Sequence, residues 1–149
     1  MDKRKVGTKA ACRITGVDRV RLTDIIANKE YTAAPDTTPG KARLFDERDL
    51  IALYLFRHFD EAGYPARLAG RICADIRDAL TIEPDAEFVT LKHNFPDRAY
   101  VAAGAHFDPQ DTHLSGLPFM FTTIFDLRNW RGMVKHLIED EFNTKHDED

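Results

Sequence analysis

The chain has 149 residues, of which 43% are hydrophobic and 31% are charged, and its formal net charge is −4. This length fits one domain or two small ones. No run of about 18 apolar residues is present, so no transmembrane helix is expected, and the charged residues 1–5 lack the apolar run of a secretory signal. Two cysteines are too few for a disulfide framework. The expectation is a cytoplasmic protein with reduced thiols.

Charge is distributed unevenly along the chain. Residues 1–43 hold ten lysines and arginines and five acidic residues, a net charge of +5. Residues 81–149 hold six lysines and arginines and thirteen acidic residues, a net charge of −7. Such asymmetry indicates a basic face at one end of the molecule and an acidic body at the other. Chance clustering on a solvated surface is the alternative.

Two short helices joined by a tight turn are predicted near the N-terminus, over residues 8–15 and 19–28. Gly16 lies in the turn and tolerates the positive φ that a short helix-to-helix connection often needs. Asp18 is a suitable N-cap for the second helix, because its carboxylate can accept hydrogen bonds from backbone N–H groups two or three residues later.

The helix over residues 19–28 is predicted to have an apolar back and a basic, polar front. The front carries Arg19 and Arg21, with Thr23 following. Such a helix suits insertion into a major groove. The apolar back comes from residues that recur at spacings of three and four: Leu22, Ile25 and Ile26.

A turn-rich loop with two prolines and a glycine follows at residues 35–40. It leads into Lys41 and Arg43, which stand at alternate positions and are predicted to form a small wing able to reach a phosphate backbone. Asp46 is then predicted to cap a third helix, with Asp49 three residues later.

Three segments carry a recognisable pattern: residues 15–22 (TGVDRVRL), 43–50 (RLFDERDL) and 61–64 (EAGY). Together they resemble the winged helix-turn-helix of MerR-type transcription regulators. In that family they correspond to the turn and recognition helix, the end of a wing, and an aromatic-glycine turn between the next two helices. The resemblance covers about residues 5–80 and implies binding to double-stranded DNA. Residues 23–25 (TDI) depart from it, because the family usually has an Arg-Tyr-Tyr run there.

The third helix, over about residues 47–62, is apolar on much of its surface and is predicted to be central. Gly63 is suited to end it, and Pro65 to begin a fourth helix that runs to about residue 80. Cys12 and Cys73 are interpreted as small core residues.

The predicted fold class is α+β. Residues 1–80 form a winged helix-turn-helix domain of four helices plus a wing, and residues 81–149 form a small unit of about three strands and one helix, for dimerisation or effector binding. The strand over residues 119–125 is apolar on both faces. The other elements expected after residue 80 are a linker (81–86), strands (88–92 and 100–103) around a turn (94–97), a polar loop (104–117) and a helix (127–142) capped by Asp126.

A three-stranded sheet is marginally stable alone, so the C-terminal unit is expected to lean on the helical half or on a second copy. A homodimer is the simplest interpretation. A two-fold protein can grip a palindromic site with two helices about one DNA turn apart, roughly 34 Å.

No sequence pattern argues for an enzyme, a cofactor or a metal site. His93, His106 and His113 lie near two aspartates, but their spacing matches no closed zinc site. Nucleophile-elbow, P-loop, dinucleotide-binding and zinc-protease motifs are absent from the sequence. The aromatic residues Phe119, Phe121, Phe125 and Trp130 are typical of a core, with a small apolar effector among them as the alternative.

The predicted function is sequence-specific binding of double-stranded DNA by a dimeric transcription regulator. Alternatives are an excisionase-like factor that bends DNA, and a protein-interaction module that does not bind DNA. Arg19, Arg21 and Thr23 would meet base edges or nearby phosphates. The full set of predicted DNA-binding residues is Lys9, Arg13, Asp18, Arg19, Val20, Arg21, Thr23, Lys41 and Arg43.

Overall fold

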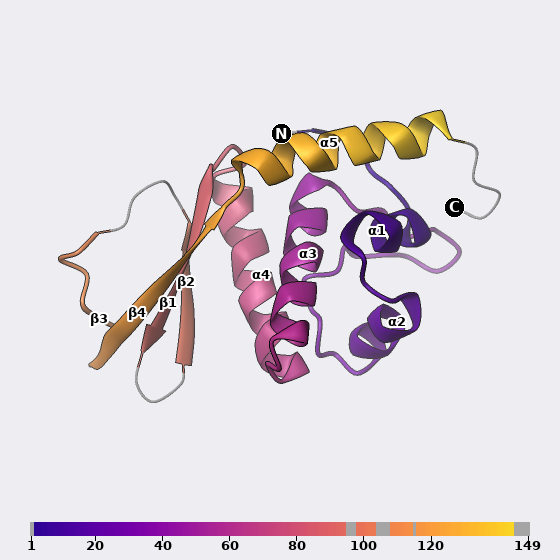
Figure 1. The fold of residues 1–149 in the computed structure, drawn as a ribbon. Helices are drawn as coiled ribbons and strands as arrows, with labels where there is room; N and C mark the ends of the chain where they lie inside the picture. The colour runs from indigo at the N-terminus through magenta and orange to yellow at the C-terminus, as the bar shows by residue number, and fades with distance from the viewer. Residues whose placement is uncertain (1, 95–97, 104–107, 115, 145–149) are drawn as a thin grey trace.

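A computed structural model describes residues 2–94, 98–103, 108–114 and 116–144 of the chain. Within these ranges, five helices and a small antiparallel sheet form a mixed α+β fold (Figure 1). The elements are α1 (Thr8–Thr15), α2 (Arg19–Ala27), α3 (Glu47–Glu61), α4 (Ala66–Ile82), β1 (Phe88–Asn94), β2 (Arg98–Ala103), β3 (His113–Leu114), β4 (Leu117–Asp126) and α5 (Arg128–Asn143).

The sheet has the strand order β2-β1-β4-β3, and neighbouring strands are antiparallel. In the register of the central strand, Val89 lies opposite Ala103 on one side and Phe125 on the other. Helix α4 lies between this sheet and α3, and α1 and α2 lie beyond α3 (Figure 1). Helix α5 returns across one end of all these layers.

The α1–α2 connection follows the local signals in the sequence. Gly16 has a φ of 77°, and its N–H donates to Cys12 O at 2.8 Å, which ends α1. The Asp18 carboxylate accepts from Arg21 N at 3.0 Å. The predicted N-cap of α2 is therefore confirmed.

Two reciprocal hydrogen bonds at the start of α3 confirm the predicted cap there. The Asp46 N–H donates to the Asp49 carboxylate at 2.9 Å, and the Asp49 N–H donates to the Asp46 carboxylate at 3.0 Å. Arg77 of α4 donates to Asp49, and Arg48 donates to Asp46 at 2.6 Å. Burial raises the pKa of Asp49, whereas the hydrogen bonds from Arg48 and from the Asp49 N–H outweigh burial and lower the pKa of Asp46. The ion pair between Asp49 and Arg77 joins the N-terminal end of α3 to α4.

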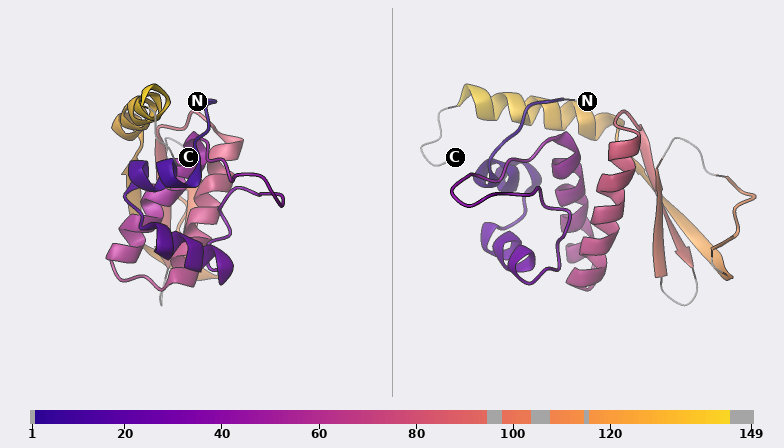
Figure 2. Two further views of the ribbon diagram at one scale, coloured as in Figure 1. Left: turned by 90° about the vertical axis from the view of Figure 1, so that its right-hand side faces the viewer. Right: turned by 180° about the vertical axis from the view of Figure 1, so that it is seen from behind.

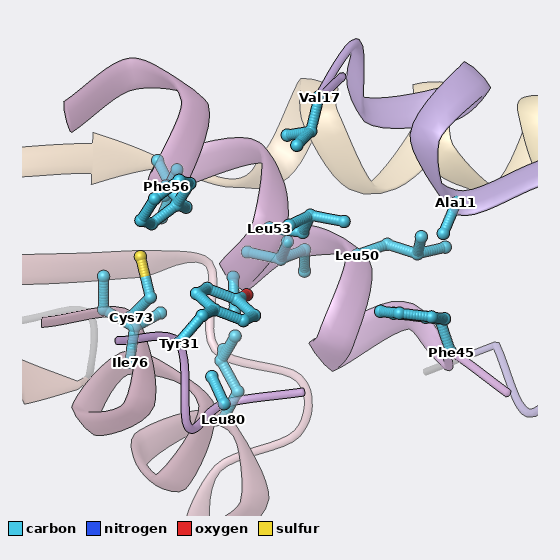
Figure 3. Close-up of a cluster of buried hydrophobic side chains, with 14 of the residues drawn as sticks. Ala11, Val17, Tyr31, Phe45, Leu50, Leu53, Phe56, Cys73, Ile76 and Leu80 are labelled. Carbon is cyan, nitrogen blue, oxygen red and sulfur yellow. The ribbon is translucent and has the colours of Figure 1, made fainter. Parts of the chain in front are cut away.

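Helix α3 is central, as predicted. Leu50, Ile51 and Leu53 are fully buried, and Phe56 meets Tyr31 edge to face with ring centroids 5.2 Å apart (Figure 3). The buried cluster is continuous from the N-terminal arm to α5, which supplies Val134 and Ile138 to it. The boundary near residue 80 stays a prediction, since one core contains side chains from both sides of it.

Both cysteines contact this core. Cys73 is fully buried, which confirms its interpretation as a core residue, and burial raises the pKa of its thiol. Cys12 is half-buried and packs against the cluster, and burial raises its thiol pKa as well.

Element boundaries differ from prediction mainly in the second half. Helix α4 runs two residues into the predicted linker, and the predicted loop at 104–117 contains β3. Residues 95–97 of the predicted turn and 104–107 of that loop, which include His106, lie outside the described residues. Helix α5 begins at Arg128 rather than Leu127, although the Asp126 carboxylate still accepts from Arg128 N at 3.0 Å.

Strand β4 is less buried than its apolar sequence predicted. Met120, Phe121 and Ile124 are 61%, 61% and 55% exposed. Phe125, by contrast, packs edge to face on Phe59 of α3, with the two ring centroids 5.7 Å apart. The difference arises because the helices cover only part of the sheet (Figure 1).

None of the helices in the described ranges is both long enough and apolar enough to span a membrane.

Candidate nucleic-acid interface

Helix α2 lies at the surface, with two apolar residues buried beneath it and most of its polar residues in solvent. Leu22 and Ile25 are completely buried, whereas Arg19, Val20 and Thr23 are exposed. Val20 is 69% exposed, so this face combines a cation, a hydroxyl and a bare apolar side chain. Figure 2 (left) shows α1 and α2 on the side turned to the viewer, with the loop between α2 and α3 projecting at one edge.

Arg19 and Arg21, expected to act together, are in different environments. Arg21 forms an ion pair with Asp60 of α3 at 2.9 Å, and its side chain is 41% exposed. The hydrogen bond from Asp60 raises the pKa of the Arg21 guanidinium. An ion pair this exposed contributes about 0–1 kcal/mol to stability. Replacing Asp60 by a phosphate as the partner of Arg21 would therefore cost little free energy. In the described part of the chain, Arg19 forms neither a hydrogen bond nor an ion pair.

Arg13, predicted to hold the DNA backbone, is engaged by α5. Its Nε and Nη2 donate to the two carboxylate oxygens of Glu141 at 2.9 and 2.8 Å. Lys9 lies on the same helix and is partly buried. A phosphate would have to compete with the Glu141 carboxylate for Arg13.

The predicted wing is an irregular loop held by its own hydrogen bonds. Arg43 donates to Pro35 O, and Thr37 Oγ1 donates to Lys41 O at 2.9 Å. An isolated bridge joins Val6 to Phe45 at the end of the loop. Lys41 is exposed, whereas Arg43 is partly buried and helps to close the loop. Since no hairpin forms between residues 28 and 46, the winged arrangement stays a prediction.

The predicted interface residues are therefore only partly brought together. Arg19, Val20 and Thr23 share the outer surface of α2, and Asp18 fixes the first turn beneath them. Arg13, Arg21 and Arg43 lie on three different elements; Arg13 and Arg21 are bonded to carboxylates of α5 and α3, and Arg43 to a carbonyl of its own loop.

Sequence reasoning missed a groove beside the C-terminal end of α2. It has a volume of 510 Å³, and its lining includes the cations Lys29, Arg67 and Arg71. The spacing of Arg67 and Arg71, four residues apart on α4, is a signal that one helix face carries both charges. Lys29 follows the C-cap residue of α2, and no such signal in the sequence marks it.

The aromatic residues considered as an effector site mostly pack against other rings. Trp130 stacks on Tyr54 at 4.2 Å, and Phe121 stacks on His93 at 4.1 Å. Burial lowers the pKa of His93. Across the residues that the structure describes, no group of three or more metal-ligating side chains gathers.

Comparison of the chain with protein-family models finds no match, and comparison with curated proteins finds none either.

Proposed function

We propose that this protein binds double-stranded DNA sequence-specifically, as a dimeric transcription regulator with α2 as its recognition helix. The observation that carries the proposal is the outer face of α2, where Arg19, Val20 and Thr23 are exposed above a fully buried apolar back. A surface helix with this division can enter a major groove without losing its packing.

Each exposed side chain on α2 has a partner in a major groove. Arg19 can donate two hydrogen bonds to the O6 and N7 atoms of guanine, and Thr23 can donate or accept at a base edge. Val20 offers the apolar surface that a thymine methyl group contacts. Arg21 reaches DNA after leaving Asp60, and the contacts to phosphates fall to Lys9, Arg13, Lys41 and Arg43.

A homodimer is part of this proposal, with the sheet as its interface. Among the described residues, strand β3 pairs with β4 only at Leu117 and Pro118, so the outer edge of residues 120–126 has no partner strand. An unpaired edge can add a strand from a second copy. The sheet and α2 lie at opposite ends of the molecule (Figure 1), so pairing through the sheet leaves both α2 surfaces free.

Arg19→Ala should weaken specific binding by about 1–3 kcal/mol while changing non-specific binding little. The physical reason is the loss of a bidentate base contact. Fragments selected from genomic DNA and mapped by footprinting supply the site, and fluorescence anisotropy with site and scrambled duplexes measures both affinities.

Arg128→Ala is the matched control, because Arg128 is an exposed arginine on α5 paired with Asp126. Equal specific affinities for wild type, Arg19→Ala and the control would contradict base reading by α2. The position of the selected site distinguishes a promoter from the attachment site that an excisionase would use. A bending assay with circularly permuted duplexes provides the second distinction.

Ile124→Lys should shift the dimer towards monomer without unfolding the chain. Ile124 is 55% exposed on β4, so lysine is tolerated in the monomer, while charge on an edge strand opposes pairing with another edge. Sedimentation equilibrium over a concentration series measures the association. A wild-type chain that stays monomeric throughout the series would contradict the dimer.

A further inference from the structure

The groove beside α2 is built from two segments that are distant in the sequence. Its volume is 510 Å³. One wall follows the C-terminal end of α2, and the other is the first two turns of α4. The lining residues are Lys29, Glu30, Thr32, Pro65, Arg67, Leu68 and Arg71.

The backbone of α4 touches the chain after α2, which fixes the two walls relative to each other. A Cβ atom at Gly70 would lie only 1.7 Å from Glu30 O, so a glycine is required for this approach. Tyr31, the next residue, is 3% exposed and packs against Phe56. The positions of Lys29 and of the α4 cations are therefore set by the core.

The groove carries an excess of positive charge. Lys29, Arg67 and Arg71 are all exposed, and none forms an ion pair within the described residues. Glu30 is the acidic residue among the lining residues and is partly buried. Burial raises the pKa of Asp75, four residues further along α4, and the charge of Arg71 opposes that rise without cancelling it. Three cations and one carboxylate favour an anionic ligand.

Lys29 has an unusual backbone conformation for a lysine. Its φ is 57°, in the left-handed region that favours glycine. Glu30 N donates to Ile25 O at 2.9 Å and Lys29 N to Ile26 O at 3.1 Å, the two bonds of a Schellman motif. Glycine usually stands at this position of the motif. A cation is held here at a cost in stability, which is typical of functional sites.

We infer that this cationic groove binds the phosphate backbone of the same DNA duplex that α2 reads; the inference rests on the proposed function. Helix α2 has nine residues and is therefore about 13 Å long, close to the major-groove width of about 12 Å. When its N-terminal turn meets base edges, the residues after its C-terminal end reach the rim of the groove, where the phosphates lie.

The double substitution Arg67→Ala/Arg71→Ala tests this assignment. Each lost phosphate contact lowers the slope of log affinity against log salt by about 0.9, so the slope should fall by about 1.8. Between 50 and 200 mM salt, wild type should then lose about twelvefold more affinity than the double variant. The loss at low salt should be similar for specific and scrambled duplexes, since phosphates carry no sequence information.

The matched control is Arg128→Ala/Lys135→Ala, which removes two exposed cations from α5, at the opposite end of α4 from the groove (Figure 1). It should keep the wild-type slope. Lys29→Gly provides an independent readout, because glycine relieves the backbone strain. This variant should unfold at a higher urea concentration and yet bind DNA more weakly with a reduced salt slope.

The outcomes separate this inference from the proposed function. If wild type binds DNA and Arg67→Ala/Arg71→Ala retains its full salt slope, the groove assignment is overturned while DNA binding by α2 stands. If wild type binds no selected or scrambled duplex, both are overturned. A slope reduced in the groove variants and unchanged in the α5 control supports the assignment.

Discussion

Replacing Asp49 by alanine should lower the free energy of unfolding by about 3 kcal/mol, measured by urea denaturation. Asp49 is 3% exposed, and its carboxylate accepts from both Asp46 N and Arg77. Alanine would leave the Asp46 N–H buried without an acceptor and would remove the carboxylate to which Arg77 is hydrogen-bonded. Removing one member of a buried polar network costs more than the network contributes, because the remaining groups stay desolvated.

Asp18→Ala is the comparison for the loss of one exposed capping hydrogen bond without an ion pair. Whereas Asp49 is the third residue of α3 and accepts from the N-cap N–H, Asp18 is the N-cap of α2 and is exposed, and within the described residues it accepts from the backbone of Arg21 rather than from a guanidinium. Its loss should therefore cost only about 1 kcal/mol. Asp49→Asn keeps a capping oxygen and removes the charge, and should fall between the two alanine variants. An Asp49→Ala variant that is no less stable than Asp18→Ala would mean that Arg77 adds nothing at this site.

The starts of α2 and α3 could be predicted because their signals act over three residues. Asp18 meets Arg21 N, and Asp46 and Asp49 meet each other's backbone, whatever the rest of the chain does. Gly16 likewise meets a backbone requirement that is local. Such elements follow from the sequence because the atoms that stabilise them are close neighbours along the chain.

The partners of the basic residues could not be predicted in the same way. Arg13 bonds to Glu141, 128 residues later, and Arg21 bonds to Asp60, 39 residues later. Sequence reasoning treated these arginines as available for phosphates, whereas the fold gives each an internal carboxylate. The pairing of Arg13 depends on the return of α5 over α1, which no local pattern specifies.

The groove beside α2 could not be predicted from the sequence for a related reason. Lys29 and Arg67 become neighbours only because α4 approaches the backbone of Glu30 at Gly70. A glycine inside a helix is a weak signal by itself, since it can mark a close contact or simply an exposed position. Gly132 of α5 illustrates the second case, because a Cβ atom added there would meet no other atom within 4 Å.

Gly70→Ala should destabilise the fold by about 3 kcal/mol even though alanine is the better helix former by up to about 1 kcal/mol. The new Cβ would lie 1.7 Å from Glu30 O and 2.8 Å from Glu30 C, so backbone rather than a flexible side chain must move. Gly132→Ala should instead raise the free energy of unfolding by up to about 1 kcal/mol, because its surroundings are open. Urea denaturation of wild type and both variants measures the free energy of unfolding, which should fall for Gly70→Ala and rise for Gly132→Ala.

The same substitution connects the stability of the core to the proposed phosphate contacts. Displacing α4 from Glu30 also moves Arg67 and Arg71 away from Lys29, so the folded fraction of Gly70→Ala should bind DNA with a lower salt slope. If Gly70→Ala and Gly132→Ala were equally stable, α4 would not contact the chain after α2 at Gly70. The two walls of the groove would then not be fixed relative to each other, which would contradict the groove.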